Sequence, residues 1–169
     1  MTPAADAPLA VNGWTLFAHP LFLDQVEAIV ARVEALRARD PIGYTKKNAT
    51  KRLAAIATLV FELIPQDPAR PEYRQGSTLG DDRKHWFRAK FFQQYRLFFR
   101  YHQASRILVY AWVNDEDTKR AHERSDDAYR VFQKMLERGR PPDDWENLLA
   151  QAKRETKRLR TIIGRARRD

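Results

Sequence analysis

The sequence contains no cysteine and few histidines, and these scarcities exclude several kinds of chemistry. Without cysteine there is no disulfide, no thiolate nucleophile and no cysteine-based zinc site. The HExxH, GxSxG, Walker and GxGxxG motifs are all missing. The four histidines, none paired at metal-ligand spacing, are His19, His85, His102 and His122. We therefore expect neither a metal centre nor any cofactor.

Long apolar runs are missing as well. No stretch approaches the roughly 20 apolar residues that a bilayer-spanning helix needs. The first residues, MTPAADAPLAVNG, lack the basic segment followed by an apolar segment that marks a signal peptide. The lack of cysteine is compatible with a reducing compartment. These features predict a cytoplasmic protein without membrane association.

The chain carries more basic than acidic side chains. Lysine and arginine number 31 against 22 aspartates and glutamates, which gives a net charge of +9. This excess favours a polyanionic partner, either nucleic acid or an acidic protein. With 43% hydrophobic residues among 169, the chain can bury one core, so we expect a single globular domain.

Two amphipathic helices follow a short strand near the N-terminus. After a disordered start at residues 1–10, VNGWTLFAHP predicts a strand. The next segment has apolar residues at helical spacing and stops before Asp40 and Pro41. A second helix begins near Asn48 and continues to Pro65. The two form a helical hairpin whose apolar stripe needs a sheet to cover it.

The central part of the chain predicts a sheet. A surface loop spans QDPARPEYRQGSTLGDDRKH, and antiparallel strands are then expected at 86–92, 95–102 and 106–113. ILVYAWV, apolar on both faces, is the central strand. A helix capped by Ser125 ends at Gly139, and a last helix follows it. We thus predict an α+β fold: a small antiparallel sheet of about four strands, packed by the N-terminal helical hairpin, with C-terminal helices.

The stretch WFRAKFFQQYRLFFRY separates cationic from apolar side chains. Counting by twos puts Arg88 and Lys90 on one face of the first strand, and Arg96 and Arg100 together on one face of the second. The opposite faces are apolar enough to be core. A cationic face of this kind is most often solvated. Combined with aromatic rings it also suits single-stranded RNA, because cations contact phosphates and rings stack on bases.

The same cations are suited to RNA cleavage. Attack by the 2′-hydroxyl group needs a base to take its proton, a cation to neutralise the charged phosphorane and an acid to protonate the leaving 5′-oxygen. None of these roles requires a metal. Side chains of the kinds found in this stretch can therefore supply them.

Four separated blocks in the same order resemble a known family: VNGWTLFAHPLF, YRLFFRY, WVNDEDTKRAH and DDAYRVFQKMLERGRPPDDWE. They are similar to the RelE/ParE superfamily of bacterial toxins, and more closely to its YhaV-type toxins. The resemblance covers residues 11–149, and the basic residues 150–169 form a helical extension outside it. It implies a RelE-like fold and a ribosome-dependent, metal-independent endoribonuclease that cleaves mRNA and inhibits growth. The implied partner is a PrlF-like antitoxin of the AbrB type, and the complex would bind operator DNA through that antitoxin.

The resemblance also implies roles for individual residues. Arg88 and Lys90 match paired basic residues, with Lys90 as general base or phosphate contact. Arg96 matches an arginine that stabilises the transition state, and Tyr129 a tyrosine that orients the attacking group or stacks on a base. One position departs from the family pattern. Where a further arginine is expected, this sequence has the segment 114–116, Asn-Asp-Glu.

That departure leaves the general acid to a later cation. We choose Arg120, with His122 as a substitute. Basic and aromatic residues around the site are predicted to bind RNA: Lys84, Trp86, Arg100, Lys119 and Arg124. The basic tail from Lys153 to Arg168 is predicted either to attract ribosomal RNA or to contact an acidic antitoxin segment, or else to be a solvated helix.

Two other functions stay open at this point. A ParE-like inhibitor would bind a protein target such as gyrase through the basic face, without chemistry. A non-catalytic protein would hold RNA or the ribosome without cutting, and each basic substitution would then weaken binding modestly. The basic residues favour RNA over gyrase but do not separate cutting from holding.

Overall fold

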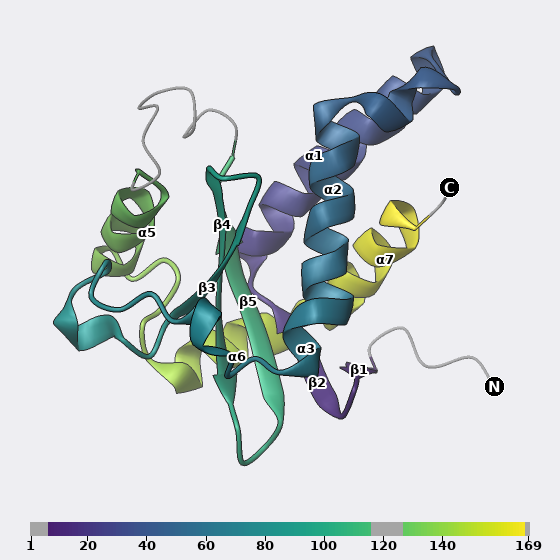
Figure 1. The fold of residues 1–169 in the computed structure, drawn as a ribbon. Helices are drawn as coiled ribbons and strands as arrows, with labels where there is room; N and C mark the ends of the chain where they lie inside the picture. The colour runs from purple at the N-terminus through teal and green to yellow at the C-terminus, as the bar shows by residue number, and fades with distance from the viewer. Residues whose placement is uncertain (1–6, 116–126, 168–169) are drawn as a thin grey trace.

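A computed structural model describes residues 7–115 and 127–167 of the chain. Its centre is a five-stranded sheet in the order β1-β2-β5-β4-β3 (Figure 1). The strands are β1 Leu9–Val11, β2 Trp14–Ala18, β3 Phe87–Phe91, β4 Tyr95–His102 and β5 Ile107–Val113. The α+β class is confirmed, and β5 is central as its doubly apolar sequence predicts. The sheet differs from the expected antiparallel one of about four strands: it has five, and β2 runs parallel to β5.

The extra strand, β1, arises from a tight turn at the N-terminus. Asn12 and Gly13 both have positive φ, 50° and 82°, and join β1 to β2 with Val11 opposite Trp14. This is the geometry that an Asn-Gly pair favours in a two-residue hairpin. The prediction of disorder at residues 1–10 is therefore wrong for the part of β1 that it includes, while residues 1–6 lie outside the described part of the chain.

The predicted helical hairpin is present. Helix α1, Pro20–Arg39, and helix α2, Asn48–Thr58, lie side by side and are joined through the short 3₁₀ turn Gly43–Lys46 (Figure 1). Helix α2 continues through a π-helical turn, η2 Leu59–Leu63, into the short α3, Ile64–Gln66. Pro65 therefore lies within the last helical turn instead of ending the helix. No helix among the described residues has the length and apolarity that crossing a membrane requires.

Both faces of the sheet are buried, each by different helices (Figure 1). The face toward α1, α2 and the C-terminal helix α7, Thr156–Ala166, carries Leu16, Leu97, Phe99, Leu108 and Tyr110. The other face is covered by α5, Asp127–Glu137, and α6, Trp145–Lys153, and it carries Phe17, Phe98 and Trp112. Trp86, which precedes β3, and Phe132 of α5 belong to the same core cluster. The strand face on which the cations lie is thus partly covered by aromatic core, which alternation along a strand does not indicate.

The C-terminal segment forms two helices where one was expected. Helix α6 ends at Lys153, and α7 runs from Thr156 to Ala166. The break lets the two halves serve opposite cores: Leu148 of α6 packs with the α5 side, whereas Leu159 and Ile162 of α7 pack with the α1 side. The boundary expected at residues 149 and 150 falls inside α6.

The basic tail is largely engaged within the molecule. Arg158 pairs with Asp24 at 2.6 Å, and Arg165 pairs with Glu34 at 2.6 Å, both on α1. Arg160 donates to the carbonyl of Ala7 at 2.6 Å. The folded domain therefore holds these three arginines, while attraction of the tail to ribosomal RNA or contact with an antitoxin segment stays a prediction. Arg168 lies outside the described residues.

The predicted surface loop before β3 is more ordered than its composition suggests. It contains two 3₁₀ turns, η3 Pro71–Tyr73 and η4 Asp81–Arg83. Tyr73 and Leu79 are 4% and 0% exposed, so the loop contributes to the core. Arg74 forms an isolated antiparallel bridge with Phe87, which fixes the loop to the outer edge of β3.

Candidate active site

Two basic residues face each other across the β3–β4 hairpin. Lys90 is directly opposite Arg96, and Arg88 is opposite Phe98. Facing residues of an antiparallel pair have Cβ atoms about 5 Å apart on the same side of the sheet. Phe92 and Gln93, with φ of 47° and 63°, form the connecting turn. The hairpin therefore brings the cations at 88, 90 and 96 onto one face, as predicted.

Tyr129 of α5 lies at the point where two arginines converge. Its Oη atom accepts a hydrogen bond from Arg88 Nε at 2.7 Å and from Arg96 Nε at 3.2 Å. Its ring packs edge-on against Phe98 at 5.7 Å between centroids, and Phe132, one turn later on α5, stacks on Phe98 at 4.3 Å. The aromatic contacts hold α5 against the sheet, and so they fix the position of the hydroxyl group.

Arg96 is buried, with 5% of its surface exposed. Its Nη1 atom donates to the carbonyls of Gln93 at 2.7 Å and Tyr95 at 2.9 Å, and its Nε to Tyr129. Its backbone N–H donates to Asn114 Oδ1 at 2.7 Å. No hydrogen bond from Nη2 to another described residue is present. Arg96 thus has a structural function in the turn and offers one edge of its guanidinium to the site.

Asn114 was missed as a site residue, although the sequence marks it as a departure from the family pattern. It is buried at 2% exposure, and its Nδ2 donates to the carbonyl of Gln94 at 3.1 Å. Together with its bond to Arg96, this contact stabilises the β3–β4 turn from the end of β5. A polar side chain directly after an apolar central strand was the available signal.

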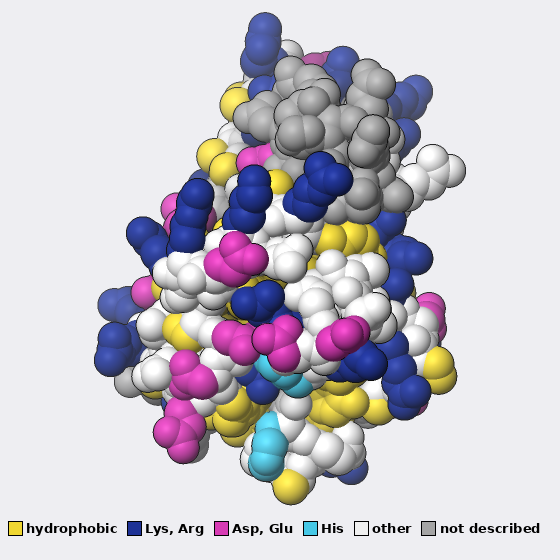
Figure 2. Space-filling view, turned by 90° about the vertical axis from the view of Figure 1, so that its left-hand side faces the viewer, with side chains coloured by type: hydrophobic (Ala, Val, Ile, Leu, Met, Phe, Trp, Pro, Cys, Tyr) yellow, Lys and Arg dark blue, Asp and Glu magenta, His cyan; other side chains and the backbone are white. Residues whose placement is uncertain are grey.

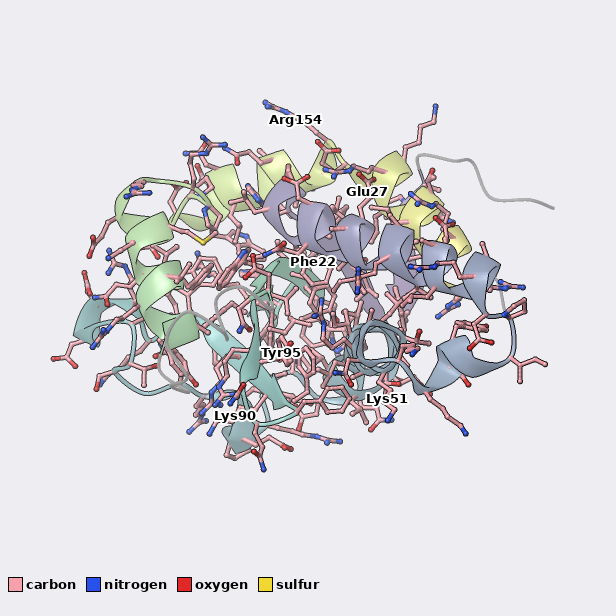
Figure 3. The ribbon with its side chains drawn as sticks, turned by 90° about the horizontal axis from the view of Figure 1, so that it is seen from above. Phe22, Glu27, Lys51, Lys90, Tyr95 and Arg154 are labelled. Atoms are coloured by element: carbon pink, nitrogen blue, oxygen red, sulfur yellow. The ribbon has the colours of Figure 1, made fainter. Side chains whose placement is uncertain are left out.

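Lys90 differs from Arg96 in being exposed. In Figure 3 Lys90 lies at the periphery of the ribbon, whereas Tyr95 of β4 lies nearer the centre. Its ammonium group makes no hydrogen bond or ion pair with the described residues, and neither Arg88 nor Arg96 is paired with a carboxylate among them. Two arginines without carboxylate partners among the described residues therefore bond the Tyr129 hydroxyl, and Lys90 lies opposite one of them across the hairpin. This arrangement is suited to an anion.

Trp86 and Arg100 were predicted to bind RNA, and the structure places both in a partly buried cluster around Asp143. Trp86 is 0% exposed, and its Nε1 donates to Asp143 Oδ1 at 2.7 Å. The Arg100 guanidinium lies 5.4 Å from the ring centroids of both Trp86 and Trp145 and donates to the Asp143 carbonyl at 2.6 Å. The prediction for Trp86 is therefore wrong, and Arg100 links β4 to the segment before α6.

Asp143 is the polar centre of that cluster. Its Oδ1 atom also lies 2.9 Å from His85 Nε2. Partial burial by itself raises the pKa of Asp143, but the hydrogen bonds from Trp86 and His85 outweigh burial and hold this pKa below its usual value. Burial lowers the pKa of Arg100. These contacts stabilise the fold beside the site.

Residues 16–153 match a family described as a toxin with endonuclease activity, of a toxin–antitoxin system, the YhaV toxins. The chain belongs to this family. "Toxin YhaV" of Escherichia coli O6:H1 is 48% identical over 145 residues, which cover 85% of this chain and 94% of the relative. "Ribonuclease toxin YhaV" of Escherichia coli K12 is 47% identical over 145 residues, with the same coverage.

No solved structure matches the chain. The membership of this YhaV-type toxin in the RelE/ParE superfamily therefore stays a prediction. The family match ends at residue 153 and includes the strands and helices that carry Arg88, Lys90, Arg96 and Tyr129.

The other residues that were predicted to belong to the site are either exposed or outside the described residues. Lys84 is exposed at the end of η4. Lys119, Arg120, His122 and Arg124 lie outside the described residues. Figure 2 looks onto the side where α5 lies: Lys and Arg side chains are spread over this face, with Asp and Glu side chains among them. The described residues contain no group of three His, Asp or Glu side chains that could hold a metal ion.

Proposed function

We propose that this YhaV-type toxin is a ribonuclease that cleaves mRNA on the ribosome without a metal, and so inhibits growth. The observation that carries the proposal is the convergence of Arg88 and Arg96 on the Tyr129 hydroxyl, beside Lys90, which pairs with none of the described residues. A merely solvated cationic face has no reason to direct two guanidinium groups at one buried oxygen. The name of the K12 relative, a ribonuclease toxin, supports RNA as the substrate.

The proposed reaction is an internal transfer within the RNA chain. The 2′-oxygen attacks the adjacent phosphorus, the bond from phosphorus to the 5′-oxygen breaks, and the products are a 2′,3′-cyclic phosphate and a 5′-hydroxyl group. The proton of the 2′-hydroxyl passes to a base, and another proton is delivered to the leaving oxygen. Lys90 takes the first proton or contacts the phosphate. Arg88 and Arg96 stabilise the negative charge that grows on the phosphorane oxygens.

Tyr129 contributes its hydroxyl hydrogen. A phenol oxygen has two acceptor positions and one hydrogen to donate. Both acceptor positions are occupied by Arg88 and Arg96, so the hydrogen is directed elsewhere. It is suited to donate to the 2′-oxygen or to a phosphate oxygen, which orients the attacking group. Arg120, with His122 as the substitute, remains the proposed general acid.

The partners follow from the family. A toxin of a toxin–antitoxin system has an antitoxin, and we propose one of the PrlF-like, AbrB type. Operator DNA would be bound only by the complex, through the antitoxin. We place the toxin in the cytoplasm, where mRNA and ribosomes are found. Of the described cations in the tail, Lys153, Arg154, Lys157 and Arg167 are exposed and remain candidates for ribosomal RNA.

The test is to map new RNA ends in cells after a brief induced pulse of toxin. Wild type should create internal mRNA ends, and Lys90→Ala and Tyr129→Phe should abolish them. Lys46→Ala, which removes an exposed charge from the turn between α1 and α2, is the matched control and should cut like wild type. Intact transcripts in growth-arrested cells would overturn the proposal and favour a gyrase inhibitor or a protein that only holds RNA.

A further inference from the structure

A cationic pocket of about 460 Å³ lies at the outer edge of β3, next to the candidate active site. Its walls come from three segments: the π-helical turn η2, the loop around η3 and β3 itself. The polar residues that line it are Arg70, Glu72, Arg74, Arg88 and Lys90. Arg88 and Lys90 belong to both places, and Arg88 contacts both Tyr129 and the Glu72 carbonyl, so the pocket adjoins the site that contains Tyr129.

The charges of the pocket are unbalanced. Its described lining holds four cations and one carboxylate. The carboxylate, Glu72, lies 3.7 Å from Arg70 and is well exposed. Arg74 and Lys90 are exposed, and neither side chain makes a hydrogen bond or ion pair with the described residues. Two cations are therefore available to an anion, and Arg88 lies between them and Tyr129.

The loop that supplies Arg74 is held in place before any ligand arrives. The ring of Tyr73 is 4% exposed and packs edge-on against Phe99 at 5.5 Å between centroids. The backbone of Arg74 is bridged to Phe87, and the carbonyl of Glu72 accepts from Arg88 Nη1 at 2.6 Å. A fixed loop loses little conformational freedom on binding, which favours affinity.

We propose that this pocket binds a backbone phosphate of single-stranded RNA, next to the phosphate that reacts at the Tyr129 cluster. Arg74 is the residue that this site adds to the predicted set. The inference rests on the proposed ribonuclease function, because a chain held at the cluster presents its neighbouring phosphate to the adjoining pocket. A phosphate-bound arginine would fix the position of the RNA without reading its sequence.

The experiment measures binding of the full-length toxin to a short single-stranded RNA whose 2′-hydroxyl groups are all methylated, so that it cannot be cut. Fluorescence anisotropy is recorded at several salt concentrations. Arg74→Gln should raise Kd about three- to tenfold. It should also reduce the slope of log K against log salt by about 0.7, the change for one phosphate contact on a single strand. Arg74→Lys should keep most of both.

The matched control is Arg32→Gln, which removes the same charge from the exposed side of α1, outside the segments that line the pocket. It should leave Kd and slope close to those of wild type. Equal changes in Arg74→Gln and Arg32→Gln would overturn the pocket, because general charge would then explain them. Wild type that does not bind the RNA would also overturn it.

Two further readings separate the pocket from alternatives. In the first, inorganic phosphate competes with the RNA. Phosphate that displaces the RNA no better than chloride of equal ionic strength would support a site that needs a nucleic-acid chain. Displacement by a low concentration of phosphate would show a free-phosphate site, and the proposal would fail. Cut transcripts in cells together with unchanged binding by Arg74→Gln would overturn the pocket alone. Weaker binding by Arg74→Gln without any cleavage by wild type would overturn the proposed ribonuclease instead.

Discussion

Tyr129 Oη accepts hydrogen bonds from both Arg88 Nε, at 2.7 Å, and Arg96 Nε, at 3.2 Å. This single atom ties α5 to the β3–β4 hairpin, against which α5 is otherwise held by aromatic packing. It brings two arginines of one hairpin together with a tyrosine that lies 41 and 33 residues further along the chain. The function of the cluster can be tested apart from the stability of the fold, because its members differ in burial.

Removing only the Tyr129 hydroxyl should abolish most activity. Tyr129→Phe keeps the ring that packs on Phe98 but loses the hydrogen donor, so RNA cleavage should fall by about 100-fold or more. The control is Tyr101→Phe, whose ring also packs in the sheet, against Phe87 at 4.8 Å. The measurement compares the RNA cleavage rates of the two purified variants. Equal rates would exclude a role for the Tyr129 hydroxyl in the chemistry.

Arg96 and Lys90 should differ in what their loss does to stability. Arg96→Ala leaves the carbonyl of Gln93 and the buried carbonyl of Tyr95 without this donor, and should lower the free energy of unfolding by about 2 to 3 kcal/mol. Lys90→Ala removes an exposed side chain and should change it by less than about 0.5 kcal/mol. Urea denaturation measures both. A stable Arg96→Ala variant would show that its guanidinium is not structural, contrary to the observed contacts.

Local sequence patterns predicted most of the helices and strands, but not which residues from distant parts of the chain cover them. The alternation from Trp86 to His102 placed the correct residues on each face, because a strand has a period of two wherever it lies. The same pattern could not show that Trp86 is covered, since its cover comes from Phe132 and Asp143 far along the chain. The role of Arg74 was likewise hidden, because its loop has no periodicity.

In the C-terminal tail too, the local pattern did not predict contacts with distant residues. The helical spacing of apolar residues predicts that Leu159 faces a core, but it cannot show that α6 and α7 pack against opposite faces of the sheet. The run of basic residues did not indicate that Arg158 and Arg165 pair with acidic residues of α1. Ion pairs between segments more than a hundred residues apart cannot be read from composition.

Helix α7 should therefore be needed for stability rather than dispensable. Ile162 is 2% exposed in the core, so Ile162→Ala should cost about 2 to 4 kcal/mol of unfolding free energy. Arg154→Gln, at an exposed position just before α7, should cost less than about 0.5 kcal/mol. Chemical denaturation compares them, and an Ile162→Ala variant as stable as wild type would contradict the packing of α7. Charge variants such as Arg154→Gln, not truncation, are thus the way to test ribosome binding by the tail.

His19 should make stability depend on pH. It is 4% exposed and caps α1, with Nδ1 accepting from the Leu21 N–H at 3.2 Å and Nε2 lying 2.6 Å from Gln151 Oε1. Nδ1 must be unprotonated to accept, so Nε2 carries the hydrogen. Burial lowers the pKa of His19, against the hydrogen bond with Gln151 and the carboxylates of Asp24 and Glu155, which raise it.

Because the folded pKa of His19 lies below the unfolded value of 6.5, the unfolded chain takes up the proton first as pH falls. The stability from His19 is complete above pH 6.5 and is lost as pH falls from there through the folded pKa. His19→Asn keeps a capping oxygen but does not titrate. Urea denaturation at pH 7.5, 6.5 and 5.5 should therefore show wild type losing stability relative to His19→Asn on acidification. A difference that stays constant with pH would show that His19 does not titrate differently in the folded and unfolded states.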